Sequence, residues 1–116
     1  MPRFRVLRHD SPRGLHYDLL LETATLLVTF ALDREPTPGT TGKAQQLPDH
    51  RRQYLEYEGP ISGDRGSVAE WDSGLYLIMR RNEQMLDISV EGRMLKGRIV
   101  LRLLDASSQE WEFQVM

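Results

Sequence analysis

The chain has 116 residues, of which 40% are hydrophobic and 28% charged, and it carries a net charge of -2 and no cysteine. This length suits one modest core, and the lack of cysteine excludes disulfides, thiolate zinc sites and a cysteine nucleophile. The charge gives no support for tight, non-specific binding to nucleic acid. No apolar run approaches the roughly 20 residues that span a bilayer, so we expect no membrane partner and a cytoplasmic location.

The hydrophobic pattern predicts eight short strands. In chain order they cover 4–9, 15–21, 25–32, 67–71, 75–80, 85–90, 95–104 and 111–115. Turn-rich segments separate several of them, including 11–14, 72–74, 91–92 and 105–108. A proline- and glycine-rich loop is expected at 33–42 and a helical turn at 49–56. This spacing, with almost no 3.6-residue period, predicts a single all-β domain built as an antiparallel barrel or sandwich.

The three histidines each have an acidic residue close by in the sequence. His16 and Asp18 are two apart in an expected strand, so their side chains point to the same face. His9 ends the preceding strand, and the intervening turn brings it back beside them. Two imidazoles and one carboxylate suit a divalent cation of the Mn²⁺, Fe²⁺ or Zn²⁺ type. The alternative is a hydrogen-bonded surface pair without a metal.

The segment Arg8-His9-Asp10-Ser11-Pro12-Arg13-Gly14-Leu15-His16-Tyr17-Asp18-Leu19-Leu20-Leu21-Glu22 resembles the opening signature of the 3′-phosphoesterase family of bacterial DNA ligase D. That signature runs His-Asp-Ala-x-Arg-Leu-His-Tyr-Asp-x-Arg-Leu-Glu. Further stretches resemble later family motifs in order, namely 25–32, 44–54, 57–61, 66–74 and 92–98. The match covers almost the whole chain, and all three histidines fall on motif positions.

The resemblance implies a compact, closed or nearly closed β-barrel of about eight strands. It also implies a hydrolase that uses a divalent metal, Mn²⁺ first and Zn²⁺ or Co²⁺ as alternatives. Family members remove a 3′-terminal ribonucleoside from a primer strand and then the remaining 3′-phosphate. The expected partners are therefore nucleic-acid 3′ ends in a primer-template, together with ligase or polymerase proteins of non-homologous end joining.

By motif position, the resemblance implies that His9, His16 and Asp18 hold the metal. His50 is the implied catalytic group, which contacts the scissile phosphate, and Tyr54 is the implied holder of a phosphate oxygen. Two acidic residues are expected to orient a ligand or a basic residue from outside the ligand set, with a plain surface role as the alternative: Glu22 and Asp10.

Two departures from the signature bear on activity. Leu20 stands where the family has an arginine that contacts the phosphate, which removes a bidentate donor. One of four basic residues could replace it: Arg13, Lys43, Arg51 or Arg52. Gly14 is one extra residue in the turn between His9 and His16, a place where glycine is tolerated.

Three functions remain open from the sequence. The first is a Mn²⁺-dependent phosphoesterase that acts on 3′ ends. The second is a divergent phosphoesterase that acts on another phosphate ester. The third is a non-catalytic barrel that binds metal or nucleic acid.

Overall fold

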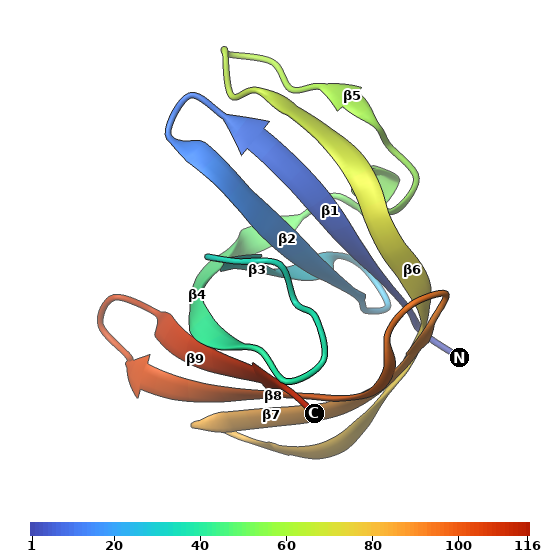
Figure 1. Cartoon of the computed structure of the whole chain (residues 1–116), viewed down its shortest axis with the longest axis vertical. Coiled ribbons are helices and arrows are strands. Elements are labelled where there is room, and N and C mark those ends of the chain that lie inside the picture. Colours follow the sequence, from blue (N-terminus) through green and yellow to red (C-terminus); the bar gives the residue numbers. More distant parts are fainter.

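The computed structural model describes residues 1–116 and contains antiparallel strands, one short 3₁₀ turn and no α-helix (Figure 1). The strands are β1 (Arg3–Ser11), β2 (Gly14–Glu22), β3 (Leu27–Leu32), β4 (Thr41–His50), β5 (Gly59–Pro60), β6 (Ser67–Asn82), β7 (Met85–Gly92), β8 (Lys96–Asp105) and β9 (Glu110–Val115). The 3₁₀ turn η1 spans Arg52–Leu55. No segment forms a helix with the length and apolar character needed to cross a membrane. The predicted all-β fold with one short helical turn is confirmed.

Eight of the nine strands form a nearly closed ring. Their hydrogen-bonded order is β1-β2-β3-β4-β9-β8-β7-β6, and a further β1–β6 pairing brings the last strand back to the first. β5 pairs only with β6 and lies outside the ring. In Figure 1 the β1–β2 hairpin and β5 form the upper part of the molecule, with β7, β8 and β9 below.

β6 takes part in two pairings along its length. Its first half pairs with β1, from Ser67 to Leu75, and its second half pairs with β7, from Gly74 to Asn82. The predicted turn at 72–74 is therefore wrong, because these residues continue one strand. Gly74 lies so close to β7 that a Cβ there would stand 2.0 Å from the Glu91 carbonyl oxygen. The glycine thus permits a close crossing between strands.

The sequence pattern also missed β4. Its inward positions are Gly42 and Ala44, which pair with Phe113 and Trp111 of β9. A Cβ on Gly42 would lie 2.7 Å from the Phe113 ring. Small residues face large ones here, so β4 lacks the alternation of bulky side chains by which strands are recognised.

The buried apolar residues form two clusters. One fills the inside of the ring, and the other covers one outer face. The larger contains 18 buried residues, among them Phe4, Val6 and Leu19. The smaller lies on the opposite face of β1, β2 and β3, and contains Leu7, Leu20, Leu27, Leu55 and Val68. Since side chains alternate along a strand, the residues that share a face with Leu7 and Leu20 lie on this outer, covered side.

Candidate metal centre

Strand alternation brings His9, His16 and Asp18 together on the outer face. His9 and His16 are directly paired in the β1–β2 ladder, and their ring centroids lie 4.3 Å apart. Asp18 is two residues beyond His16 on the same face and is buried. The potential ligand atoms of the three residues all lie within 4.8 Å of one another.

The extra glycine leaves this pairing intact. Ser11 pairs with Gly14, so the hairpin closes through the two turn residues Pro12 and Arg13. Gly14 has φ +118°, a conformation that other residues rarely adopt. The insertion is therefore absorbed at the turn, and it does not shift His9 away from His16.

Asp18 is the buried centre of the group. Its Oδ2 lies 3.0 Å from Nδ1 of His9, and its Oδ1 lies 3.1 Å from Nε2 of His16. The second contact lacks hydrogen-bond geometry, so Oδ1 is a buried carboxylate oxygen without a hydrogen-bond partner. Such an atom is costly unless something else satisfies it. A divalent cation would do so, and the donor set of two imidazoles and one carboxylate fits one.

Contacts within this group also shift the pKa values of His9 and Asp18. The hydrogen bond to Asp18 raises the pKa of His9, burial opposes the shift and the carbonyl of Arg65 adds to it. Burial raises the pKa of Asp18, but the neighbouring His16 and His9 rings outweigh it and hold that pKa below its ordinary value. The carboxylate is therefore ionised, which is the state that a metal ligand needs, and an imidazole beside it would bind a cation in its neutral form.

His50 and Tyr54 form a second pair near the end of β4. Their ring centroids lie 5.7 Å apart, and Tyr54 packs against the smaller apolar cluster, which includes Leu20. Nδ1 of His50 lies 3.0 Å from the carbonyl oxygen of Pro48. Because that oxygen only accepts, Nδ1 carries the hydrogen and Nε2 is the nitrogen left for a substrate. His50 is not among the three residues whose ligand atoms converge.

The basic residues that were predicted to bind phosphate have other partners or are exposed. Arg52 donates to Glu22 (2.6 Å) and to the carbonyl of Thr23 (2.9 Å). Lys43 lies 4.0 Å from Glu110 on the neighbouring strand, and Arg13 is exposed in the hairpin turn. Arg52 and Lys43 therefore each have a carboxylate partner outside the candidate ligand set.

The two carboxylates that were predicted to orient a ligand contact arginines and none of the candidate ligands. Glu22 accepts from the backbone N–H of Arg3 at 3.0 Å and from Arg52. The side chain of Asp10 lies 3.8 Å from Arg8. Asp10 nevertheless contributes a nearby negative charge that helps to raise the pKa of His9.

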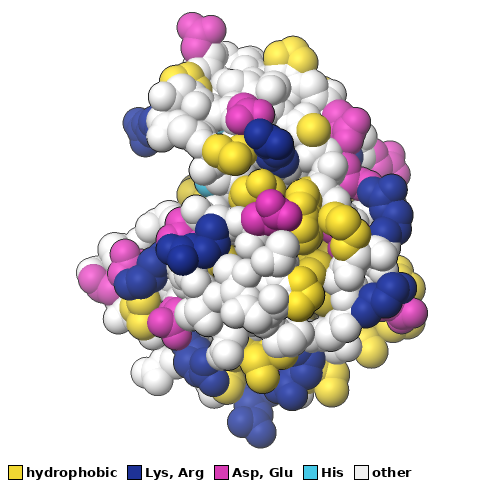
Figure 2. Space-filling model, viewed as in Figure 1, with side chains coloured by type: hydrophobic (Ala, Val, Ile, Leu, Met, Phe, Trp, Pro, Cys, Tyr) yellow, Lys and Arg dark blue, Asp and Glu magenta, His cyan; other side chains and the backbone are white.

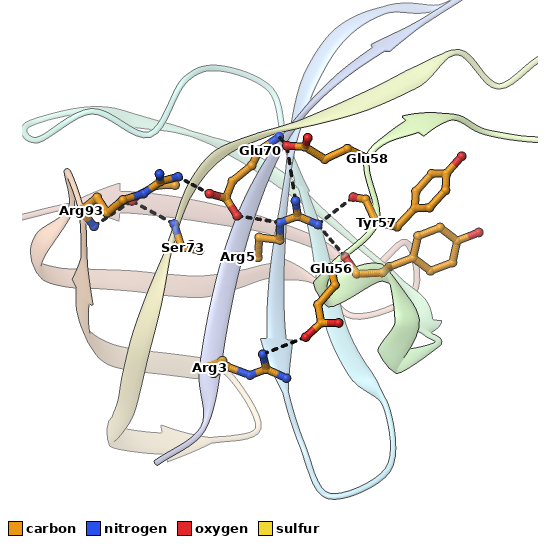
Figure 3. Close-up of polar contacts among 10 residues, drawn as sticks. Arg3, Arg5, Glu56, Tyr57, Glu58, Glu70, Ser73 and Arg93 are labelled. Carbon is orange, nitrogen blue, oxygen red and sulfur yellow. Dashed lines mark hydrogen bonds and ion pairs between the residues drawn. The ribbon is translucent and has the colours of Figure 1, made fainter.

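Sequence reasoning missed a buried arginine on this face. Arg5 donates to Glu70 (3.0 Å) and to the carbonyls of Tyr54 (3.2 Å) and Tyr57 (2.7 Å). Its Nη2 also lies 3.5 Å from Glu58 (Figure 3). Strand parity contained the signal, because residues 5, 7 and 9 alternate onto one face. The guanidinium thus ties the segment after η1 to β1.

Sequence reasoning also missed the loop that touches His9. The carbonyl oxygen of Arg65 lies 2.8 Å from Nε2 of His9. In the view of Figure 2, a notch separates the upper part of the molecule from the lower part, and histidine colour is visible at its inner edge. The short stretch between β5 and β6 carries no pattern that predicts this contact.

The chain is similar to a known domain family and to several known proteins. A model of the "DNA Ligase D 3'-phosphoesterase domain" matches residues 7–103. The "Multifunctional non-homologous end joining protein LigD" of Pseudomonas aeruginosa is 29% identical over 121 residues, covering 94% of this chain and 14% of that protein. The protein of the same description from Mycolicibacterium smegmatis is 39% identical over 77 residues, covering 61% of this chain and 10% of that protein. The chain thus spans 14% or less of the length of these two relatives.

Proposed function

The chain belongs to the DNA ligase D 3′-phosphoesterase domain family, and from this premise we propose that it is a Mn²⁺-dependent enzyme that processes 3′ ends of nucleic acid. The proposed reaction removes a 3′-terminal ribonucleoside and then the 3′-phosphate, which leaves a 3′-hydroxyl. The observation that supports it best is the convergence of His9, His16 and Asp18 around a buried, unsatisfied carboxylate oxygen.

These three residues would hold the cation, with Mn²⁺ as the first expectation and Zn²⁺ or Co²⁺ as alternatives. When bound, a divalent cation supplies charge neutralisation at the phosphoryl oxygens and lowers the pKa of an attached water. The protein's own part is to keep Asp18 ionised and to hold the two rings beside it. Pairing in the β1–β2 ladder does this without a long loop.

His50 has the geometry to act on the leaving group. The carbonyl of Pro48 accepts from Nδ1, so Nε2 is the free nitrogen, and in the imidazolium form it would donate its proton to a leaving oxygen or to a phosphate oxygen. Tyr54 stands beside that ring, and its hydroxyl would donate to another phosphate oxygen. Both roles use groups near the apolar cluster that contains Leu20, on the same outer face as the candidate ligands.

A second function is favoured by one observation. Leu20 is fully buried in the smaller apolar cluster, on the face where the family signature has an arginine. A phosphate bound on this face would therefore lack that bidentate donor. A phosphoesterase that acts on a different phosphate ester is the alternative that this supports.

The test uses purified protein with Mn²⁺ and a labelled primer-template that ends in one 3′-ribonucleotide, beside a primer that ends in a 3′-phosphate. His16→Gln removes a ligand without deleting the side chain's polarity. Lys96→Gln serves as the matched control, because Lys96 is an exposed residue of β8, a strand that carries none of the candidate ligands.

We expect stepwise conversion to a 3′-phosphate and then to a 3′-hydroxyl, with loss of at least about 100-fold in the ligand variant. The control should be unchanged. Absence of both products with Mn²⁺, Zn²⁺ and Co²⁺ would exclude the proposed reaction. Cleavage of a small chromogenic phosphodiester under the same conditions would then favour the second function.

A further inference from the structure

The loop between β5 and β6 is closed by its own hydrogen bonds. The backbone N–H of Ile61 donates to the carbonyl of Gly66 at 2.8 Å. Nε of Arg65 donates to the carbonyl of Ser62 at 2.7 Å, and Nη2 lies 3.3 Å from the Ser62 hydroxyl. We call residues 61–66 the His9 loop, because its Arg65 carbonyl is the group that contacts Nε2 of His9.

The His9 loop has a backbone that few sequences tolerate. Gly63, Asp64 and Gly66 have φ of +75°, +53° and +88°, all in the left-handed region. Gly66 is pressed against β1, and a Cβ there would stand 1.7 Å from the carbonyl oxygen of Asp10. Gly66 therefore decides how closely the loop approaches the residue next to His9.

The two ring nitrogens of His9 face different partners. Nε2 faces a backbone carbonyl, which only accepts, so Nε2 must carry a hydrogen. Nδ1 faces Asp18, the buried carboxylate of the candidate centre. Nδ1 is thus the ring nitrogen that points into the ligand group, while Nε2–H is bound to the loop.

We propose that the His9 loop is a positioning element for the metal, in which the Arg65 carbonyl holds His9 in the form that binds a cation through Nδ1. This inference rests on the proposed function, since it concerns the same centre. Outer contacts of this type, in which a ligating histidine donates its other N–H to a carbonyl, typically change metal affinity 10- to 100-fold. The loop would therefore set affinity without contributing a ligand.

The first experiment needs no mutation of the loop. Long-range ¹H–¹⁵N spectra of the imidazoles are recorded with Zn²⁺ alone, without substrate. The protein has only three histidines, and a His9→Gln variant identifies the signals of that ring. We expect the zinc-loaded protein to show His9 with a metal-bound Nδ1 and a protonated Nε2.

The second experiment measures Mn²⁺ affinity by electron paramagnetic resonance in Gly66→Ala and in Gly39→Ala. Gly39 also has φ +88°, but a Cβ there meets nothing within 4 Å. The two variants therefore carry the same local backbone strain, and only one displaces the loop from β1. We expect about 10-fold or greater loss of affinity in Gly66→Ala and none in Gly39→Ala.

The outcomes distinguish the inference about the His9 loop from the proposed function. His9 bound through Nε2, or equal affinity of the two alanine variants, would overturn the inference and leave the proposed function standing. Metal binding of the expected kind without cleavage of any 3′ end would overturn the proposed function alone. Failure to bind any metal would overturn both. If Gly66→Ala does not fold, the spectrum of the unmodified loop decides the matter.

Discussion

Arg5 of β1 is the direct partner of Leu20 in the β1–β2 ladder. A buried cation thus lies beside the position where the family signature has a phosphate-binding arginine. Arg5 contacts Glu70, two backbone carbonyls and, through Nη2 at 3.5 Å, Glu58, so its contacts within the protein stabilise the fold.

Arg5→Met should destabilise the protein by about 3–5 kcal/mol, because it leaves buried partners uncompensated. Arg5→Lys should recover little, since a single ammonium cannot reach Glu70 and two carbonyls together. The free energy of unfolding in urea measures both. The matched control is Arg93→Met, which removes the exposed partner of the same Glu70 and should cost about 1 kcal/mol or less. Equal losses in the two methionine variants would contradict the role given to Arg5.

Leu20→Arg restores the residue type of the family signature, but we expect it to lower stability by about 2–4 kcal/mol. It would bring a charge into an apolar cluster next to Arg5. Leu20→Met, which conserves volume, should cost less than about 1.5 kcal/mol. Thermal unfolding distinguishes them. A stable Leu20→Arg protein with faster 3′-end cleavage would show that this cluster can open for a phosphate-binding arginine.

Asp72 is a fully buried carboxylate with no cation beside it. Its oxygens accept from the backbone N–H groups of Ser73, Arg93 and Leu95, at 2.8–2.9 Å. Asp72→Asn should lower stability by about 2–3 kcal/mol, since an amide NH₂ would face these donors. Asp105→Asn changes an exposed carboxylate at the end of β8 and should cost much less. Urea unfolding of the pair checks the difference.

The contacts of Glu22 should make the stability of the protein depend on pH in the acid range. The backbone N–H of Arg3 is the main cause that lowers the pKa of Glu22, with the Arg3 and Arg52 side chains adding. A lowered pKa in the folded state gives stability that is present above the ordinary value of 4.5 and is lost as the pH falls through the lowered one. Glu22→Gln should cost about 0.5–1 kcal/mol near pH 7 and almost nothing near pH 3. Melting curves of both proteins at the two pH values measure this. A constant difference would show that the loss is one of packing.

Metal binding should raise the free energy of unfolding. Mn²⁺ at about 100 times its dissociation constant should raise the free energy of unfolding by about 2.7 kcal/mol, because the unfolded chain does not hold the three ligands together. His16→Gln should remove most of that increase, while Arg13→Gln, in the adjacent turn, should keep it. Calorimetric unfolding with Mn²⁺ and with a chelator provides the comparison.

Most of the fold was predictable because most strands alternate bulky and polar residues. β4 was missed because Gly42 and Ala44 make room for Phe113 and Trp111, so its inward side chains are small. The supposed turn at 72–74 failed for a related reason. Glycine and aspartate are typical of turns. Here Gly74 permits a close crossing between strands, and Asp72 is buried and accepts hydrogen bonds from backbone N–H groups.

The candidate centre was predictable in part. Spacing along one hairpin places His9, His16 and Asp18 on one face, and the geometry agrees. The contacts of Arg5 and of the Arg65 carbonyl were not predictable, because each joins β1 to a segment more than 40 residues away. Such contacts depend on the register of β1 with β6, which no local pattern specifies.

That register has a consequence for the order of folding. The β1–β2 hairpin carries all three candidate ligands and closes through a two-residue turn, so it forms among the fastest events of a folding chain. The pairing of His9 with Val68 requires a far longer segment to close, and such non-local contacts form slowly. The ligands therefore meet early, while the carbonyl that orients one of them arrives late. A metal ion present during refolding would meet an assembled but unoriented hairpin, and its binding would tighten as β6 docks.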